Sequence, residues 1–209
     1  MGAATILAMK HGVLIAVEGI DGSGKSTQVQ RLAAALRAAG HDVVATREPS
    51  VGPFGQRIRA MVHSGEAAAP EEELRWFLAD REQHVREVIE PALAAGKVVI
   101  TDRYFLSTAA YQGARGLGAE AILKQCEERF PLPDLALVLD VDPALGLARA
   151  RSRGAGLDGV FEREEYLERV AGLFRGFCRP YLEIVAARAS ADSVYEALLA
   201  KLRARLGLP

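Results

Sequence analysis

The 209-residue sequence has few cysteines and no excess of charge of either sign. Only Cys126 and Cys178 are present, and neither has a second cysteine or a histidine at metal-ligand spacing, so we expect free thiols rather than a disulfide framework. The 26 basic and 27 acidic residues leave a formal net charge of -1. We therefore expect no nucleic-acid partner, and any site for an anion must be local.

Long hydrophobic runs and targeting signals are also missing. No apolar run approaches the roughly 18 residues that a membrane-spanning helix requires. The N-terminal apolar patch, 5–9, ends at Lys10 and is too short for a secretory signal. We expect a cytoplasmic protein with no membrane partner. Its 50% hydrophobic and 25% charged residues are typical of a chain that folds around a core.

Short aliphatic runs alternate with longer stretches of helical period, which is the pattern of a parallel sheet with crossover helices. The runs are continuous rather than alternating, as expected for strands covered on both faces. We predict one α/β domain, 1–209, with a five-stranded parallel sheet between two layers of helices. The predicted strands are Val13–Val17, Asp42–Ala45, Val98–Thr101, Leu135–Val141 and Tyr181–Val185. The predicted helices are Ser26–Ala39, Phe54–His63, Glu71–Ala94 with a kink at Pro91, Ala119–Arg129, Pro143–Arg151, Glu162–Arg175 and Ser193–Leu206.

A phosphate-binding loop is the strongest motif. Residues 19–26 read GIDGSGKS and match GxxxxGK[ST], between a predicted strand and a predicted helix. In such a loop, backbone N–H groups and the helix N-terminus hold a polyphosphate, the lysine reaches its terminal phosphates and the hydroxyl binds Mg²⁺. The motif predicts a P-loop NTPase fold but no particular reaction. The predicted polyphosphate-binding residues are Gly19, Ile20, Asp21, Gly22, Ser23, Gly24, Lys25, Ser26 and Thr27.

Arginines follow the ends of two further strands, in TREP at 46–49 and TDRY at 101–104. In open α/β sheets, ligands gather beyond the carboxyl ends of the strands, so we expect Arg47 and Arg103 at the crevice that the P-loop opens. Arg103 can bind a phosphate through two N–H groups. Asp102 is a candidate Mg²⁺ ligand, together with Ser26, directly or through water.

Other polar residues are weaker candidates for metal binding or catalysis. Asp140 and Asp142 are an alternative source of the Mg²⁺ carboxylate, although Asp142 precedes Pro143 and is better explained as a helix N-cap. The histidines show neither metal-ligand nor triad spacing, and we expect all four to be structural or exposed. They are His11, His41, His63 and His84.

In order and spacing, these motifs resemble the signatures of the thymidylate kinase family. The likeness includes VEGIDGSGKSTQ at 17–28, TREP at 46–49, WFLADR at 76–81, DRY at 102–104 and LSTAAYQG at 106–113. It covers nearly the whole chain, from about residue 13 to the last predicted helix. The resemblance implies transfer of the γ-phosphate of ATP to dTMP, giving dTDP and ADP, with Mg²⁺ as cofactor. It also implies a homodimer.

The resemblance further implies an acceptor site. Phe77 and Arg81 are four residues apart and share one face of a predicted helix, where a ring and a guanidinium can hold a flat group with polar edges. By resemblance this group is thymine, Tyr111 lies where a ribose 2′-hydroxyl would clash, and Asp21 lies near the 3′-hydroxyl. The implied dTMP-binding residues are Asp21, Arg47, Phe77, Arg81, Arg103, Thr108, Tyr111 and Gln112.

A glycine-rich segment, about 149–163, predicts a short lid. The acceptor phosphate is already ionised at pH 7, so catalysis requires positioning and charge rather than a strong base. Gly22 stands where some family members carry an arginine, so the lid must supply that positive charge through Arg153, with Arg149 as the second candidate. The predicted catalytic residues are Lys25, Arg103, Arg149 and Arg153.

Two alternatives remain open at the level of sequence. One is a kinase of another small nucleotide, such as dUMP or a deoxynucleoside. The other is a P-loop module that binds a nucleotide without transferring phosphate, because Gly159 stands where an arginine is common and leaves the lid with few charges. The presence of Lys25, Asp102 and Arg103 favours a kinase over the second alternative.

Overall fold

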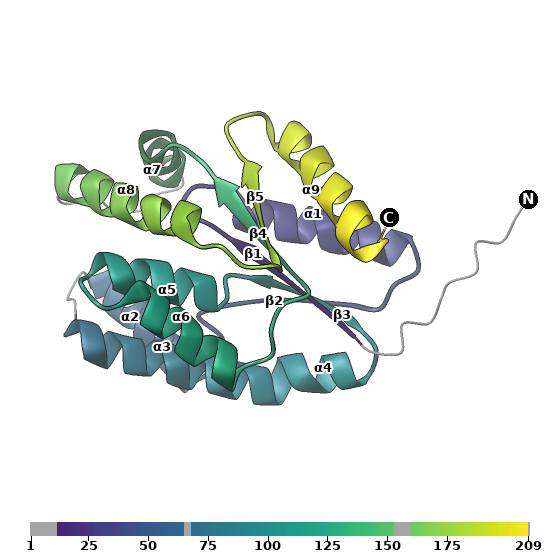
Figure 1. Ribbon diagram of the computed structural model, residues 1–209, viewed down its shortest axis with the longest axis horizontal. Coiled ribbons are helices and arrows are strands. Elements are labelled where there is room, and N and C mark those ends of the chain that lie inside the picture. Colours follow the sequence, from purple (N-terminus) through teal and green to yellow (C-terminus); the bar gives the residue numbers. More distant parts are fainter. Residues whose placement is uncertain (1–11, 65–67, 153–159, 209) are drawn as a thin grey trace, which may run out of the picture.

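The computed structural model describes residues 12–64, 68–152 and 160–208. A five-stranded sheet crosses the molecule in the order β2-β3-β1-β4-β5, and every neighbouring pair is parallel (Figure 1). This arrangement confirms the predicted α/β class and the five predicted strands. The strands are β1 (Val13–Glu18), β2 (Val43–Arg47), β3 (Val98–Asp102), β4 (Leu135–Asp140) and β5 (Leu182–Ala186).

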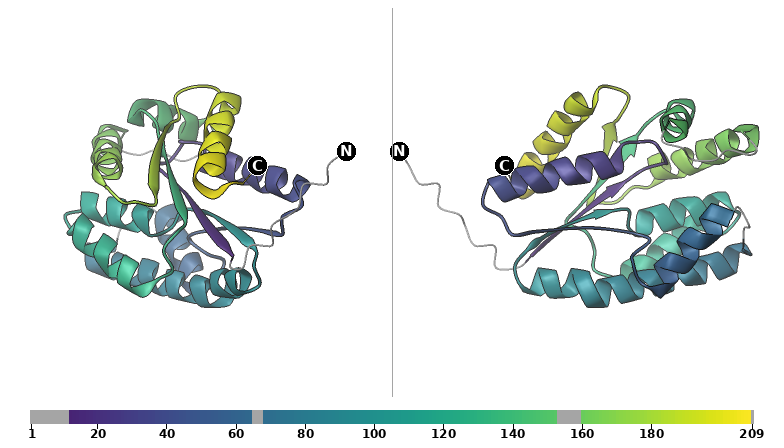
Figure 2. Two further views of the ribbon diagram at one scale, coloured as in Figure 1. Left: turned by 45° about the vertical axis from the view of Figure 1, so that its right-hand side comes forward. Right: turned by 180° about the vertical axis from the view of Figure 1, so that it is seen from behind.

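Helices cover both faces of this sheet. α1 (Lys25–Ala38) and α9 (Ala191–Leu206) pack together on one face, while α4 (Glu90–Ala94) contacts β3 and α8 (Val160–Gly176) contacts β4 across the sheet (Figure 2). The other α-helices of the described residues are α2 (Pro53–Ser64), α3 (Pro70–His84), α5 (Phe105–Ala114), α6 (Ala119–Arg129) and α7 (Pro143–Arg151). None of these described helices is long and apolar enough to cross a membrane.

The core lies along the three central strands. β1 and β3 are buried along their whole length and β4 over all but its last residue, whereas the edge strands β2 and β5 are partly exposed. Helices cover both faces of the central strands, so these strands are apolar up to their carboxyl ends, where the polar residues Glu18, Thr101, Asp102 and Asp140 occur. The continuous aliphatic runs in the sequence are the direct result.

The register brings three strands to the same end point. Asp102, at the end of β3, is opposite Val17 of β1 and Arg47 of β2. The backbone N–H of Arg103 donates to the Val17 carbonyl at 2.9 Å, and the N–H of Glu48 donates to the Asp102 carbonyl at 3.0 Å. The segments that follow β1, β2 and β3 therefore leave the sheet side by side.

The long helix predicted over 71–94 is divided. α3 ends at His84, a π-helical turn η1 (Val85–Ile89) follows, and α4 begins at Glu90. The Glu90 N–H donates to the carbonyl of Val85, five residues back. Pro91 cannot donate a hydrogen bond, and its ring clashes with the carbonyl four residues earlier in a regular helix. The irregularity expected at Pro91 thus begins earlier in the chain, at Val85.

Two further local features test the sequence analysis. The sequence did not lead us to predict α5, because seven of its ten residues are buried and it shows no polar face at helical period. The predicted N-cap at Asp142 is confirmed, since its Oδ1 accepts the N–H of Ala144 at 3.0 Å. The middle of the predicted lid, 149–163, lies outside the described residues, which omit 153–159.

Candidate active site

The loop between β1 and α1 curls around the ammonium group of Lys25. Lys25 Nζ donates to the carbonyls of Gly19 at 3.0 Å and Ile20 at 2.7 Å. Burial, together with the nearby charge of Arg103, lowers the pKa of Lys25 to about 7. Three glycines of the loop have positive φ angles, which are unfavourable for residues that carry a Cβ atom. They are Gly19 (134°), Gly22 (78°) and Gly24 (98°).

Gly22 is also packed tightly against α7. A Cβ atom on Gly22 would lie 1.9 Å from the carbonyl oxygen of Gly146, and a Cβ atom on Gly146 would lie 2.7 Å from the carbonyl oxygen of Asp21. Neither position has room for a side chain unless the backbone moves. The packing explains why this chain has glycine, and not arginine, at position 22.

A hydroxyl and a carboxylate meet beside the loop. Ser26 Oγ donates to Asp102 Oδ2, and the Asp102 side chain is buried at the end of β3. Oxygen atoms of this kind are the ligands that Mg²⁺ prefers, with water and phosphate oxygens completing its coordination. Ser26 and Asp102 therefore fit a Mg²⁺ ion. No cluster of three or more His, Cys, Asp or Glu ligands occurs in the described part of the chain.

The guanidinium of Arg103 joins the P-loop to α5. Its Nη2 donates to Asp21 Oδ1 at 2.7 Å, and its Nη1 donates to the Gly19 carbonyl at 3.2 Å. The hydroxyl of Tyr111 donates to Asp21 Oδ2 at 3.0 Å, and the Tyr111 ring centre is 4.9 Å from Arg103 Cζ. Three predicted acceptor residues, Asp21, Arg103 and Tyr111, thus form one cluster.

A buried acid, Glu18, supports this cluster. Its Oε1 accepts the backbone N–H of Tyr104 at 3.0 Å, and its Oε2 accepts the Ser107 hydroxyl at 2.5 Å. Ser107 in turn accepts a hydrogen bond from Arg103 Nη1 at 3.0 Å. Burial raises the pKa of Glu18, although Ser107 and Arg103 oppose the shift. Glu18 therefore holds the first turn of α5 in place next to Arg103.

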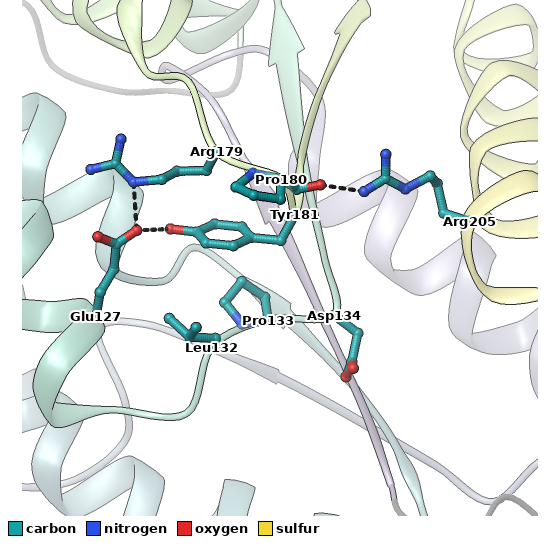
Figure 3. A pocket seen from close by; sticks show the side chains of 8 residues that line it. All are labelled: Glu127, Leu132, Pro133, Asp134, Arg179, Pro180, Tyr181 and Arg205. Atoms are coloured by element: carbon teal, nitrogen blue, oxygen red, sulfur yellow. Dashed lines mark hydrogen bonds and ion pairs between the residues drawn. The ribbon is translucent and has the colours of Figure 1, made fainter.

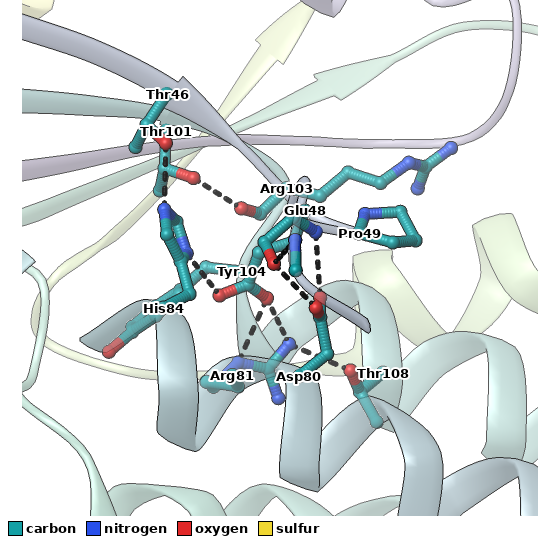
Figure 4. Close-up of polar contacts among 12 residues, drawn as sticks. Thr46, Glu48, Pro49, Asp80, Arg81, His84, Thr101, Arg103, Tyr104 and Thr108 are labelled. Carbon is teal, nitrogen blue, oxygen red and sulfur yellow. Dashed lines mark hydrogen bonds and ion pairs between the residues drawn. The ribbon is translucent and has the colours of Figure 1, made fainter. Parts of the chain in front are cut away.

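A second cluster surrounds Arg81 of α3 (Figure 4). Arg81 is 1% exposed, and its Nε and Nη2 donate to Glu48 Oε2 at 3.0 and 2.6 Å. Nη2 also donates to Thr108 Oγ1 at 2.9 Å. Burial alone would raise the pKa of Glu48, but Arg81 and His84 outweigh it and hold that pKa below its usual value. Phe77, one helical turn before Arg81, is half-buried.

Gln112 of α5 carries a buried acceptor without a donor. Its Nε2 donates to Glu73 Oε1 at 2.9 Å, so the Oε1 atom of Gln112 points away from Glu73. Gln112 is fully buried, and its Oε1 has no hydrogen-bond partner among the residues that the structure describes. Such an atom costs about 1–3 kcal/mol of folding free energy. An N–H group of a bound ligand would supply the missing bond.

Other predicted site residues lie apart from these clusters. Arg149 donates to the carbonyl of Ala187 at 3.1 Å, and Arg47 is exposed at the end of β2. Arg153 lies outside the described residues. Asp140 is paired with Arg175 at 3.3 Å, which makes it a poor alternative to Asp102 as the metal carboxylate.

The sequence analysis missed four buried polar residues of the site. Glu18, Glu48 and Asp80 lie within the quoted motifs, but the sequence analysis gave them no role. Asp80 accepts hydrogen bonds from the backbone and hydroxyl of Ser50 at 2.8 and 2.6 Å. The fourth, His84, lies three residues after Arg81. This spacing, which puts both side chains on one helical face, is the signal that could have identified His84.

A separate hollow of about 580 Å³ lies at the opposite end of the sheet, before β4 and β5 (Figure 3). The two arginines that line it, Arg179 and Arg205, are paired with glutamates of the protein. Arg179 Nε donates to Glu127 Oε1 at 2.6 Å, and Arg205 Nη1 donates to Glu183 Oε1 at 3.0 Å. The hollow is therefore not part of the P-loop site.

The carboxyl end of the sheet carries both a polyphosphate loop and a second set of arginines next to it. A site for a phosphoryl donor thus faces a site for an anionic acceptor, and this combination defines a P-loop nucleotide kinase. The family model for thymidylate kinase matches residues 17–197. This chain therefore belongs to the thymidylate kinase family.

Individual relatives agree with the family match. The chain is 44% identical over 192 residues to a thymidylate kinase of Desulfotalea psychrophila, and the alignment covers 92% of this chain and 95% of the relative. It is 46% identical over 190 residues to a thymidylate kinase of Xanthomonas euvesicatoria pv. vesicatoria, with 91% and 83% covered. The likeness thus covers more than nine-tenths of this chain and more than four-fifths of each relative.

Proposed function

We propose that the P-loop binds ATP, and that the clusters around Arg103 and Arg81 bind dTMP. The reaction is that of the family, in which the γ-phosphate of ATP passes to dTMP and gives dTDP and ADP. The other small-nucleotide kinases and the non-catalytic module considered above are not favoured. The observation that carries the assignment is the Asp21–Arg103–Tyr111 cluster, because it joins the donor loop to the helix proposed to hold the acceptor.

On the donor side, the P-loop binds the phosphates of ATP. Lys25 exchanges its bonds to the Gly19 and Ile20 carbonyls for phosphate oxygens. A phosphate anion next to the buried ammonium raises its pKa again and keeps it charged. Ser26 and Asp102 would hold Mg²⁺, which when bound neutralises phosphate charge.

On the acceptor side, Arg47 and Arg103 hold the phosphate of dTMP in line with the γ-phosphate of ATP. No general base is required, because the acceptor oxygen is already ionised. Tyr111 lies beside the sugar, and Asp21 lies near its 3′-hydroxyl. Thymine stacks on one aromatic ring and meets polar groups along its edge, which are contributed by Phe77, Arg81, Thr108 and Gln112. The unpaired Oε1 of Gln112 supports this assignment, since thymine carries a ring N–H.

Positive charge for the transferred phosphoryl group comes from the predicted lid, 149–163. Gly22 provides none, and its packing against Gly146 leaves no space for an arginine there. We propose Arg153 for this role, with Arg149 as the alternative. The charge is required mainly in the transition state, when the phosphoryl group has left its donor.

We further propose that the chain, 1–209, is one domain that works as a homodimer in the cytoplasm. Val51, Phe54 and Val62 are exposed apolar residues in or next to α2, and such residues favour self-association. Cys126 and Cys178 are unpaired, as in reducing compartments. Sedimentation of the purified protein at micromolar concentration tests the dimer.

A coupled assay of ADP release over a panel of nucleoside monophosphates tests the substrate assignment. We expect the highest kcat/KM with dTMP, a lower value with dUMP and little turnover with purine monophosphates. Lys25→Ala is the control for P-loop catalysis, and it should remove turnover while leaving the folded structure intact. Equal turnover of all monophosphates, or none, would contradict the proposal.

A further inference from the structure

His84 lies three residues after Arg81 on α3, and both of its ring nitrogens are within hydrogen-bond distance of a partner. The side chain is almost fully buried at the end of α3. Its Nδ1 is 3.0 Å from Glu48 Oε1, and its Nε2 is 2.7 Å from the hydroxyl oxygen of Thr46 (Figure 4). His84 thus connects strand β2, which carries Thr46, to the carboxylate that follows this strand.

The chemistry of these neighbours fixes the direction of the hydrogen bonds. Glu48 is a carboxylate and can only accept, so His84 Nδ1 carries the proton and donates to it. The Thr46 hydroxyl can either donate to Nε2 or accept from it. Both ring nitrogens of His84 therefore have a hydrogen-bond partner in this arrangement.

His84 and Arg81 hold the two oxygens of the same carboxylate. They are three residues apart on α3, so both side chains reach Glu48 from one helical face. Arg81 binds Oε2 through two N–H groups, and His84 binds Oε1. With both oxygens held, the carboxylate cannot turn about its terminal torsion.

The position of Glu48 in turn determines where the Arg81 guanidinium lies. The same Nη2 atom that binds Glu48 Oε2 at 2.6 Å also donates to Thr108 Oγ1 at 2.9 Å. If Glu48 turned, it would pull the guanidinium away from Thr108. The chain of contacts runs from Thr46 through His84, Glu48 and Arg81 to Thr108.

We propose that His84 is a positioning residue for dTMP binding. Through Glu48 it sets the orientation of Arg81 and Thr108, without touching the nucleotide itself. The inference rests on the proposed function, in which Arg81 and Thr108 bind the base. It predicts that a change at His84 acts on the acceptor and leaves the ATP site, which lies on the other side of Asp102, unaffected.

Steady-state kinetics of His84→Leu test the proposal. Removing one hydrogen bond to a buried carboxylate should raise KM for dTMP by about 10-fold or more, while KM for ATP stays within about twofold of the wild-type value. His84→Asn should recover most of the loss, because its amide N–H occupies the place of Nδ1–H. Thr46→Val, which removes only the outer partner, should raise KM for dTMP by a few-fold.

Val85→Ala is the matched control for a purely structural effect. Val85 is the next residue along the chain, is equally buried and belongs to the hydrophobic core. It should lower the melting temperature without a selective change in either KM. If His84→Leu behaves like Val85→Ala, or if Asn does not recover dTMP binding better than Leu, the inference is wrong. Should His84→Leu not fold, Thr46→Val and His84→Asn decide the matter by the same KM comparison.

Phe77→Ala separates a failure of this inference from a failure of the proposed function. Phe77 is half-buried and is proposed to stack directly on the base. If Phe77→Ala raises KM for dTMP and His84→Leu does not, only the role of His84 is overturned. If neither variant changes KM for dTMP, the base site itself has been assigned wrongly.

Discussion

The backbone of Gly22 in the P-loop lies against the backbone of Gly146 in α7, so closely that a Cβ on Gly22 would be 1.9 Å from the Gly146 carbonyl oxygen. The shape of the phosphate-binding loop therefore depends on a helix more than 120 residues away in sequence. The contact also couples the loop to the helix that leads into the predicted lid.

Gly22→Ala should consequently damage both the fold and the activity. The φ angle of 78° and the contact with Gly146 both disfavour a side chain, and we expect a loss of about 2 kcal/mol or more in unfolding free energy. Thermal unfolding and kcat measure the two effects. Gly172→Ala is the control, because a Cβ there has open space in α8 and alanine favours a helix. An unchanged melting temperature in Gly22→Ala would contradict the packing argument.

Lys25 gives the ATP-free protein a characteristic dependence of stability on pH. Its pKa in the folded protein is about 7, below the ordinary value of 10.5, because burial and Arg103 disfavour the charged form. Between these two pH values the unfolded chain binds more protons, so the stability of the wild type rises with pH. Lys25→Met lacks this rise.

The melting temperature of Lys25→Met minus that of the wild type should therefore be largest at pH 7 and below. It should fall steadily as the pH increases towards 10. Lys124→Met, at an exposed position of α6, is the control. A difference that grows between pH 7 and pH 10 would show that Lys25 is not destabilised by its surroundings.

Tyr111 combines a ring and a hydroxyl that can be tested separately. We propose that the ring excludes a 2′-hydroxyl, while the hydroxyl binds Asp21. Tyr111→Phe should keep the preference for deoxyribose and lower kcat/KM, because Asp21 loses a partner. Tyr111→Ala should reduce the preference itself. The measurement is kcat/KM for the deoxy and ribo forms of one monophosphate, and an unchanged ratio in Tyr111→Ala would remove Tyr111 from sugar selection.

Arg81 should contribute strongly to stability as well as to binding. Arg81→Met leaves the Glu48 carboxylate buried without its main counter-charge, and we expect a loss of about 3–5 kcal/mol in unfolding free energy. Glu48→Gln combined with Arg81→Met removes both charges, so the double variant should lose less than the sum of the single changes. Denaturant titration of the four proteins completes the cycle, and additive losses would contradict a direct pairing.

The positive charge that stabilises the transferred phosphoryl group should come from an arginine of the predicted lid. Arg153→Ala should lower kcat by on the order of 100-fold with little change in either KM, since the lost contact belongs to the transition state. Arg149→Ala is the comparison, because Arg149 donates to the Ala187 carbonyl at 3.1 Å. A normal kcat in Arg153→Ala with a collapse in Arg149→Ala would transfer the role to Arg149.

The parts of this protein that could be predicted are those with a local signal. The P-loop glycines, the Asp142 N-cap and the buried strands each follow from short-range geometry or from hydrophobic runs. α5 could not be predicted, because a helix buried on nearly all sides has no amphipathic period. The π-helical turn before Pro91 was foreseen only as a kink.

The support around the site could not be predicted for a different reason. Glu48 meets Arg81 across 33 residues, and Glu18 meets Ser107 across 89. Each residue in isolation is an ordinary charged or polar group of a kind that is usually exposed. These partners come together only in the tertiary fold, where β1, β2 and β3 end side by side and α3 and α5 pack near those ends.

The hydrogen bonds that Asp21 forms with Arg103 and Tyr111 have a thermodynamic consequence. Asp21 belongs to the loop proposed to bind ATP, while Arg103 and Tyr111 belong to the segment proposed to bind dTMP. We expect that a nucleotide which redirects these side chains on binding changes the free energy with which the second nucleotide binds. By linkage, the two effects must be equal in size, so the affinities for ATP and dTMP are not independent quantities. If the proposed sites are right, the small cluster at the end of β1 thus links the binding of the two nucleotides.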